Sequence, residues 1–141
     1  MSNPEFLDKV GRITEFCMAH QGRCFEGWRK EKIFFYVGFC LIGNACFVVY
    51  DNDNAIRSVV FAWPMKEQSL SLKFNWKLPE RGRVLFVSEM FGARRYMRRV
   101  FDMVFDRWPD IWKVCALRHK GKEAEKLEWF TPLAVGRFVG L

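Results

Sequence analysis

The sequence lacks the cysteine patterns that are typical of metal-binding and disulfide-rich proteins. Its five cysteines, at positions 17, 24, 40, 46 and 115, form no CxxC pair and no Cys/His cluster. Zinc sites need ligands at short spacings, and disulfide scaffolds are typical of shorter secreted chains. We therefore expect reduced thiols, a cytoplasmic location and no bound metal.

Signals for export and for membrane insertion are also missing or weak. The first ten residues contain no basic segment followed by an apolar run, so we expect no secretory signal. The uncharged run 33–50 has 18 residues, which is long enough to consider a membrane helix as one interpretation. However, it contains Gly43-Asn44 and is followed by the turn-forming sequence DNDN. Two buried elements joined near Gly43 explain the run better, and we expect no membrane span.

No internal repeat, low-complexity tract or linker divides the chain, so we expect a single domain over residues 1–141. Half of the residues are hydrophobic and 17% are aromatic, which indicates a folded protein with a substantial core. The net charge of +7 favours an anionic partner. Nucleic acid, a phosphorylated cofactor and a membrane surface all fit this charge.

Hydrophobic periodicity predicts an α/β domain with a mixed, mostly antiparallel sheet flanked by helices. A helix starts at Asn3-Pro4, and a second, mostly buried helix is expected at 31–42, where a strand is the alternative. Residues 45–65 read as a β-hairpin around the turn 51–54. Further strands are expected at 68–76, 83–90, 111–119 and 135–141, and further helices at 94–107 and 120–130.

The helix at 94–107 begins with an unusual concentration of positive charge. Its first residues lie in the sequence FGARRYMRRVF (91–101), which places four arginines at positions 94, 95, 98 and 99. A helix N-terminus carries partial positive charge and unsatisfied N–H groups, so these arginines oppose the helix dipole. A bound phosphate reverses this effect because it attracts both the helix terminus and the guanidinium groups.

A strand, a short glycine-containing loop and a helix follow one another here, which is the pattern of an anion site. We therefore predict that Phe91, Gly92, Ala93, Arg94 and Arg95 bind a phosphorylated cofactor. The alternative is a solvated helix face, in which the arginines at 98 and 99 pair with the acidic residues at 102 and 106.

The order of elements from about residue 45 onward resembles that of the GNAT superfamily of N-acetyltransferases. The segment RVLFVSEMFGARRYMRRVFDMVF is similar to the fourth strand, the loop and the third helix of that family, and residues 112–141 resemble its last strand–helix–strand unit. Gly92 and Ala93 stand in the family's phosphate loop. The resemblance implies a GNAT-like acyltransferase fold and acetyl-CoA or another acyl thioester as the donor, with its pyrophosphate held by this loop.

A local similarity to the toxin-activating lysine acyltransferases, a GNAT-like group, is also present. These proteins carry a Phe-Gly pair after the strand and a basic helix that Tyr96-Met97-Arg98 resembles, and residues 59–63 resemble their hairpin. The resemblance implies an acyl donor and an amine or protein-lysine acceptor. His20 lies in roughly the region of that group's catalytic histidine.

Three residues are candidates for catalysis of acyl transfer. Glu89 can act as a general base through water, Ser88 lies beside it at the end of the strand, and His119 can move protons at the end of another strand. A structural role for Glu89, paired with Arg94 or Arg95, is the alternative. No Ser/His/Asp or Cys/His arrangement is recognisable from spacing.

Two functions from different classes follow from these observations. The first is an N-acyltransferase that transfers an acyl group from CoA or a carrier thioester to an amine. The second is a catalytically inactive binding or virion protein, such as one of a phage, whose basic surface contacts nucleic acid or an acidic partner.

Overall fold

The structure is a computed structural model that describes residues 3–20, 25, 27–67, 76–120 and 124–132, with the backbone alone at 117–120 and 124–127. The helices are α1 (Asn3–Ala19), α2 (Lys30–Ile42) and α3 (Arg94–Arg107). The strands are β1 (Cys46–Tyr50), β2 (Ile56–Met65), β3 (Val84–Gly92), β4 (Lys113–Lys120) and β5 (Ala124–Phe130).

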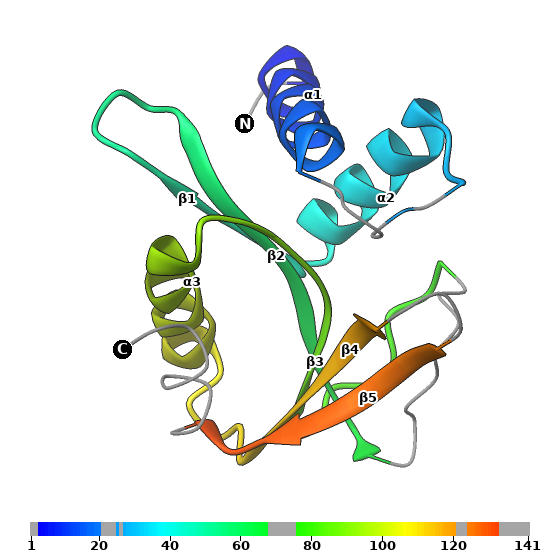
Figure 1. Ribbon diagram of the computed structural model, residues 1–141, viewed down its shortest axis with the longest axis vertical. Coiled ribbons are helices and arrows are strands. Elements are labelled where there is room, and N and C mark those ends of the chain that lie inside the picture. Colours follow the sequence, from blue (N-terminus) through cyan, green and yellow to red (C-terminus); the bar gives the residue numbers. More distant parts are fainter. Residues whose placement is uncertain (1–2, 21–24, 26, 68–75, 121–123, 133–141) are drawn as a thin grey trace.

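The five strands form one sheet in the order β1-β2-β3-β4-β5 (Figure 1). Every neighbouring pair is antiparallel except β3 and β4, which are parallel because α3 connects them across one face of the sheet. This confirms the prediction of an α/β fold with a mixed, mostly antiparallel sheet flanked by helices.

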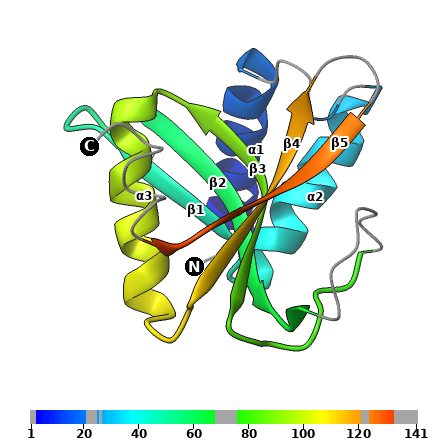
Figure 2. The ribbon, with the colours of Figure 1, turned by 60° about the horizontal axis from the view of Figure 1, so that its bottom comes forward.

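The helices cover opposite faces of the sheet, with α1 and α2 on one face and α3 on the other (Figure 2). Each face has its own buried cluster, because successive side chains of a strand point to opposite sides. On the α1/α2 face the cluster includes Phe25, Tyr36, Phe61 and Phe91. On the α3 face it includes Val100 and other residues of α3 packed on aliphatic residues of the strands.

The uncharged run 33–50 is divided between α2 and β1. The helix ends at Ile42, Asn44 has a φ of 57°, and β1 begins two residues later. Asn44 tolerates this left-handed conformation, which reverses the chain into the sheet. The prediction of two joined elements is confirmed, and within the described ranges no helix is long and apolar enough to cross a membrane.

The predicted hairpin is also confirmed. The carboxylate of Asp51 accepts hydrogen bonds from the N–H groups of Asp53, at 2.8 Å, and Ala55, at 3.0 Å. It also pairs with Arg57 at 2.7 Å, and Asn54 has a φ of 63°. The turn therefore depends on a side chain that replaces backbone partners, as aspartates commonly do in turns.

Two sequence predictions are wrong. The expected helix at 120–130 is instead β5, which pairs antiparallel with β4 from Val114↔Phe130 to Lys120↔Ala124. The local sequence KEAEKLE favours a helix, but pairing with β4 extends the sheet and overrides that preference. Phe91 and Gly92 lie at the end of β3 rather than in a loop. The predicted strands at 68–76 and 135–141 lie outside the described residues except for Trp76, which lies in a bend.

Candidate active site

An irregularity in β3 marks the position of the candidate site. In the pairing with β2, Phe61 lies opposite Glu89 and Ala62 lies opposite Val87, so Ser88 is an extra residue in β3. Such a β-bulge leaves one residue without a cross-strand partner and bends the strand. The bulge therefore changes the direction in which β3 presents its backbone groups.

The parallel neighbour leaves β3 at the same point. The register of β3 and β4 extends from Val84↔Lys113 to Val87↔Ala116, and the strands then diverge (Figures 1 and 2). After Ala116, β4 pairs with β5. Residues 89–92 of β3 thus pair with β2 on one side and have no β4 partner in the described register on the other.

Ser88 is linked to the α1/α2 face by a buried hydrogen bond. The Tyr36 hydroxyl donates to Ser88 Oγ at 3.3 Å, and Tyr36 is 1% exposed. Burial raises the pKa of Tyr36 well above its usual value, so its hydroxyl keeps its proton. Sequence reasoning did not identify Tyr36, because nothing local to α2 indicates a partner 52 residues away.

Glu89 lies beside Ser88 and is half-buried. Burial raises the pKa of the Cys17 thiol, and the negative charge of Glu89 raises it further. The same charge contributes to the raised pKa of Tyr36. The Glu89 carboxylate therefore lies close enough to α1 and α2 to act on groups in both helices.

The turn from β3 into α3 is held tightly against β2. Gly92 has a φ of 107°, and a Cβ atom there would lie 2.2 Å from the Arg57 carbonyl oxygen. Ala93 N–H donates to the same oxygen at 3.3 Å, while the Ser58 hydroxyl donates to the Ala93 carbonyl at 3.3 Å. Glycine is therefore required at 92 by its conformation and by the approach of β2. The side chain of Phe91 is 2% exposed and belongs to the core.

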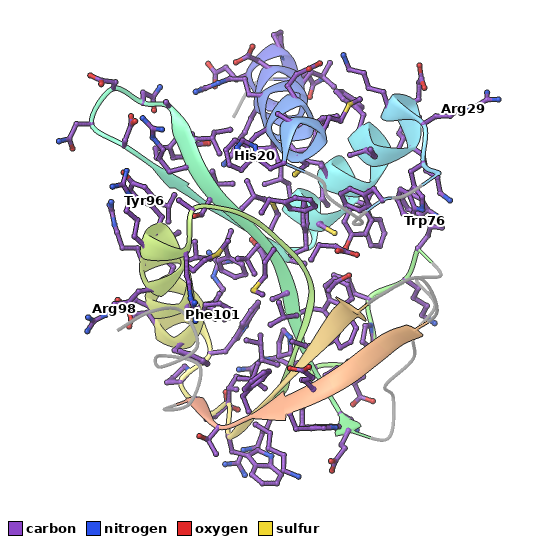
Figure 3. All side chains as sticks on the ribbon, in the orientation of Figure 1. His20, Arg29, Trp76, Tyr96, Arg98 and Phe101 are labelled. Carbon is purple, nitrogen blue, oxygen red and sulfur yellow. The ribbon has the colours of Figure 1, made fainter. Side chains whose placement is uncertain are left out.

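The first turn of α3 carries the predicted positive charge at its surface. The helix begins at Arg94, no side chain caps it, and its first turn contains no acidic residue. The arginines at 94, 95, 98 and 99 are all exposed. Figure 3 shows Arg98 pointing away from the sheet, whereas Phe101 packs toward it.

The ion pairs of the alternative interpretation do not form among the described residues of α3. In the part of the chain that the structure describes, neither Arg98 nor Arg99 has an acidic partner within 4.0 Å. The Arg95 guanidinium lies 4.9 Å from the centre of the Tyr96 ring and pairs with no described carboxylate, including that of Glu89. The helix start is therefore a positive surface that internal ion pairs do not neutralise at these three positions.

His20 lies close to the same turn. Its Nδ1 atom is 2.9 Å from the Phe16 carbonyl oxygen, and its ring stacks on Phe16 at 4.2 Å. The tip of the Phe16 ring would lie 3.0 Å from a Cβ atom at Gly92. Because a carbonyl oxygen only accepts, the neutral ring carries its proton on Nδ1 and keeps Nε2 as a proton acceptor. The His20 side chain is exposed, so its ring is accessible from solvent.

The structure thus brings together part of the predicted site. Ser88, Glu89, Gly92 and the first turn of α3 follow one another along β3 and its turn. The third predicted catalytic residue, His119, lies in β4 beyond the point where β4 leaves β3, and its side chain is not among those that the structure describes. Among the described residues, no group of three or more histidine, cysteine or acidic side chains could hold a metal ion.

Comparison with known proteins identifies no family for this chain. No protein-family model matches the sequence, and no curated protein is significantly similar to it.

Proposed function

We propose that the protein is an N-acyltransferase that transfers an acyl group from CoA or a carrier-bound thioester to an amine. The proposal rests on a set of structural features that follow one another along the chain. A bulged strand separates from its parallel neighbour and leads through Gly92 into a helix whose exposed first turn is rich in arginine. We include a GNAT-like arrangement of the elements in this proposal. It differs from the family pattern in that β5 occupies residues 124–130, where a helix was expected.

The phosphate groups of the donor bind at the start of α3 in this proposal. The first N–H groups of a helix have no partner within the helix and point outward, so they attract anions. Arg94 and Arg95 add charge-assisted hydrogen bonds. Gly92 and Ala93 position this helix start through their contacts with β2 rather than through contacts with the donor.

The thioester lies along the edge of β3 after Val87, where β4 no longer pairs. Backbone N–H groups at a bulge can polarise the thioester carbonyl as negative charge develops on its oxygen. Ser88 Oγ accepts a hydrogen bond from Tyr36, so its own proton is available for another acceptor. Ser88 is therefore placed to donate a hydrogen bond to the sulfur of the leaving thiolate, which takes its proton from solvent, and Tyr36 is a positioning residue.

Removal of the amine proton requires a base. Glu89 is half-buried beside Ser88, and His20 is exposed near the turn, with its Nδ1 atom 2.9 Å from the Phe16 carbonyl oxygen. Either residue can accept the proton through one water molecule. We assign the role to Glu89 because it is adjacent to the bulge, and we retain His20 as the second candidate base.

Donor binding is tested by thermal unfolding with CoA and acetyl-CoA. A ligand that binds only the folded state raises the melting temperature. At a ligand concentration of 100 times Kd, it stabilises the folded state by about 2.7 kcal/mol. We expect this effect to be lost in Arg94→Glu and retained in Arg107→Glu, which changes the other end of the same helix. No shift with either ligand, or equal losses in both variants, would contradict the proposal.

Catalysis is tested separately by acyl transfer to a panel of amines. Glu89→Gln should lower kcat by about 10²–10⁴-fold while leaving the CoA-induced thermal shift unchanged. His20→Ala serves as the comparison, since a larger loss there would reassign the base. Activity that neither variant lowers would remove general base catalysis from the proposal.

A second candidate function is the binding of nucleic acid or an acidic protein without catalysis. It is favoured by the exposed arginines at 95, 98 and 99, which have no ion pair among the described residues. Phosphate contacts would make affinity fall steeply with salt. Salt-sensitive binding to DNA or RNA, without a thermal shift from CoA, would favour this function.

A further inference from the structure

A cavity of about 530 Å³ lies at the start of α2, away from the turn between β3 and α3. Its lining residues are Gly27, Arg29, Glu31, Lys32, Phe35 and Trp76. Figure 3 shows Arg29 and Trp76 at the same edge of the molecule. The volume lies within the range of small-molecule sites, which is roughly 300–1,000 Å³.

Two aromatic side chains of this cavity are unusually exposed. Phe35 is 67% exposed and Trp76 is 41% exposed. The Trp76 ring is fixed from behind, because it stacks on Trp28 at 6.5 Å and meets Phe39 edge-on at 5.9 Å. A ring that is held in place but still exposed offers a preformed surface for stacking, with little conformational entropy to lose.

The polar side chains of the cavity favour a negative ligand. Arg29 and Lys32 contribute two positive charges and Glu31 contributes one negative charge, which leaves a net charge of +1. Lys32 Nζ lies 4.1 Å from the centre of the Trp28 ring, so the cation is held over the aromatic group beside the cavity. Lys30, in contrast, does not line the cavity and pairs with Glu15.

We propose that this cavity binds a flat aromatic molecule that carries an anionic group, with the chemistry of a nucleoside monophosphate. The aromatic part stacks on Trp76 beside Phe35, and the anion pairs with Arg29 and Lys32. Stacking on an aromatic side chain suits any nucleobase, because every base has a π-face. This site is separate from the proposed acyl donor site and does not depend on it.

The proposal is tested by calorimetric titration with three probes, AMP, adenosine and inorganic phosphate, of which the last two are the halves of the first. AMP should bind at least about tenfold more tightly than either half, because only AMP has both the ring and the anion. Lys32→Gln should weaken AMP about tenfold and leave adenosine unchanged, since one charge-assisted contact is lost. Trp76→Leu should weaken both AMP and adenosine.

Matched controls are present in the chain. Lys30→Gln removes a neighbouring charge outside the cavity, and Trp112→Leu removes another exposed tryptophan that has a lysine over its ring, Lys113 at 4.4 Å. Both controls should bind AMP as the unchanged protein does. The absence of AMP binding at millimolar concentration would overturn the proposal. AMP binding that Lys32→Gln and Trp76→Leu do not weaken, or that the controls weaken equally, would also overturn it.

Discussion

The two faces of the sheet differ in chemistry although they share the same strands. On the α1/α2 face, the buried cluster contains six aromatic residues, the thiols of Cys17, Cys40 and Cys115, and the Tyr36–Ser88 hydrogen bond. On the α3 face, the buried cluster is mainly aliphatic and contains no cysteine. The α3 face carries its charge on the outside, in the arginines of the helix.

This difference indicates a division of roles. The α3 face is a simple hydrophobic layer that holds the basic helix start in place, and the α1/α2 face places polar groups beside the bulge in β3. Buried polar groups are costly unless they are hydrogen-bonded, so the buried Tyr36–Ser88 pair on the α1/α2 face is informative. We expect chemistry on the α1/α2 side of β3 and anion binding at the start of α3.

The largest expected effect compares equivalent residues of the two faces. Phe61 is 0% exposed and packs against three aromatic rings, whereas Phe101 is 5% exposed and lies near one, that of Phe105. Phe61→Ala should lower the free energy of unfolding by about 3–5 kcal/mol, and Phe101→Ala by less, because its site has more freedom to collapse. Urea denaturation measures both. A larger loss in Phe101→Ala would contradict the comparison.

The turn that joins the two faces gives the next effect. A Cβ atom at Gly92 would meet the Arg57 carbonyl at 2.2 Å and would require a strained φ of 107°. Gly92→Ala should therefore destabilise the fold by at least about 1–3 kcal/mol, measured by urea denaturation. Gly11→Ala in α1 is the control, because a Cβ atom there meets nothing within 4 Å, and it should be neutral or stabilising. Equal stability of the two variants would show that the turn is not constrained as described.

A smaller effect is expected from the polar pair of the α1/α2 face. Tyr36→Phe removes the hydroxyl that donates to Ser88 and should cost about 1 kcal/mol of unfolding free energy. It should also lower acyl-transfer kcat without changing the CoA-induced thermal shift. Tyr50→Phe, a partly buried tyrosine in β1, should change neither quantity. A loss of CoA binding in Tyr36→Phe would place the donor elsewhere.

Much of the fold follows from local patterns in the sequence, but some elements depend on contacts between distant residues. The 3.6-residue spacing of α3 and the turn residues at 51–54 specify local structure, so these elements were predicted correctly. β5 was not, because its residues favour a helix and only the open edge of β4 makes them a strand. The bulge at Ser88 and its bond to Tyr36 depend on residues far apart in the chain, so no local pattern indicates them.

The last prediction concerns alkaline pH rather than a substitution. Burial raises the pKa of Cys40 to about 12 and also raises that of Cys46. Because the folded pKa values lie above the unfolded value of about 8.5, the stabilisation is complete below that pH and is lost as pH rises toward 12. The free energy of unfolding, measured under reducing conditions, should therefore fall between pH 8 and pH 11, within the range these pKa values define.

The control for this pH effect is Cys40→Ala, which removes one of the buried thiols. Its stability should fall less steeply with pH over the same interval, although its value at neutral pH is lower. An identical slope in the variant and the unchanged protein would show that the Cys40 thiol does not contribute to the loss.

The most direct test of the account is a crystal structure of the protein with CoA at saturating concentration. We predict density for the pyrophosphate within hydrogen-bonding distance of the first N–H groups of α3, beside Gly92 and the arginine side chains, with the pantetheine arm along β3 beyond Val87. A CoA molecule bound at another surface, or an empty helix start at that concentration, would contradict the proposal that this basic turn exists to hold an acyl donor.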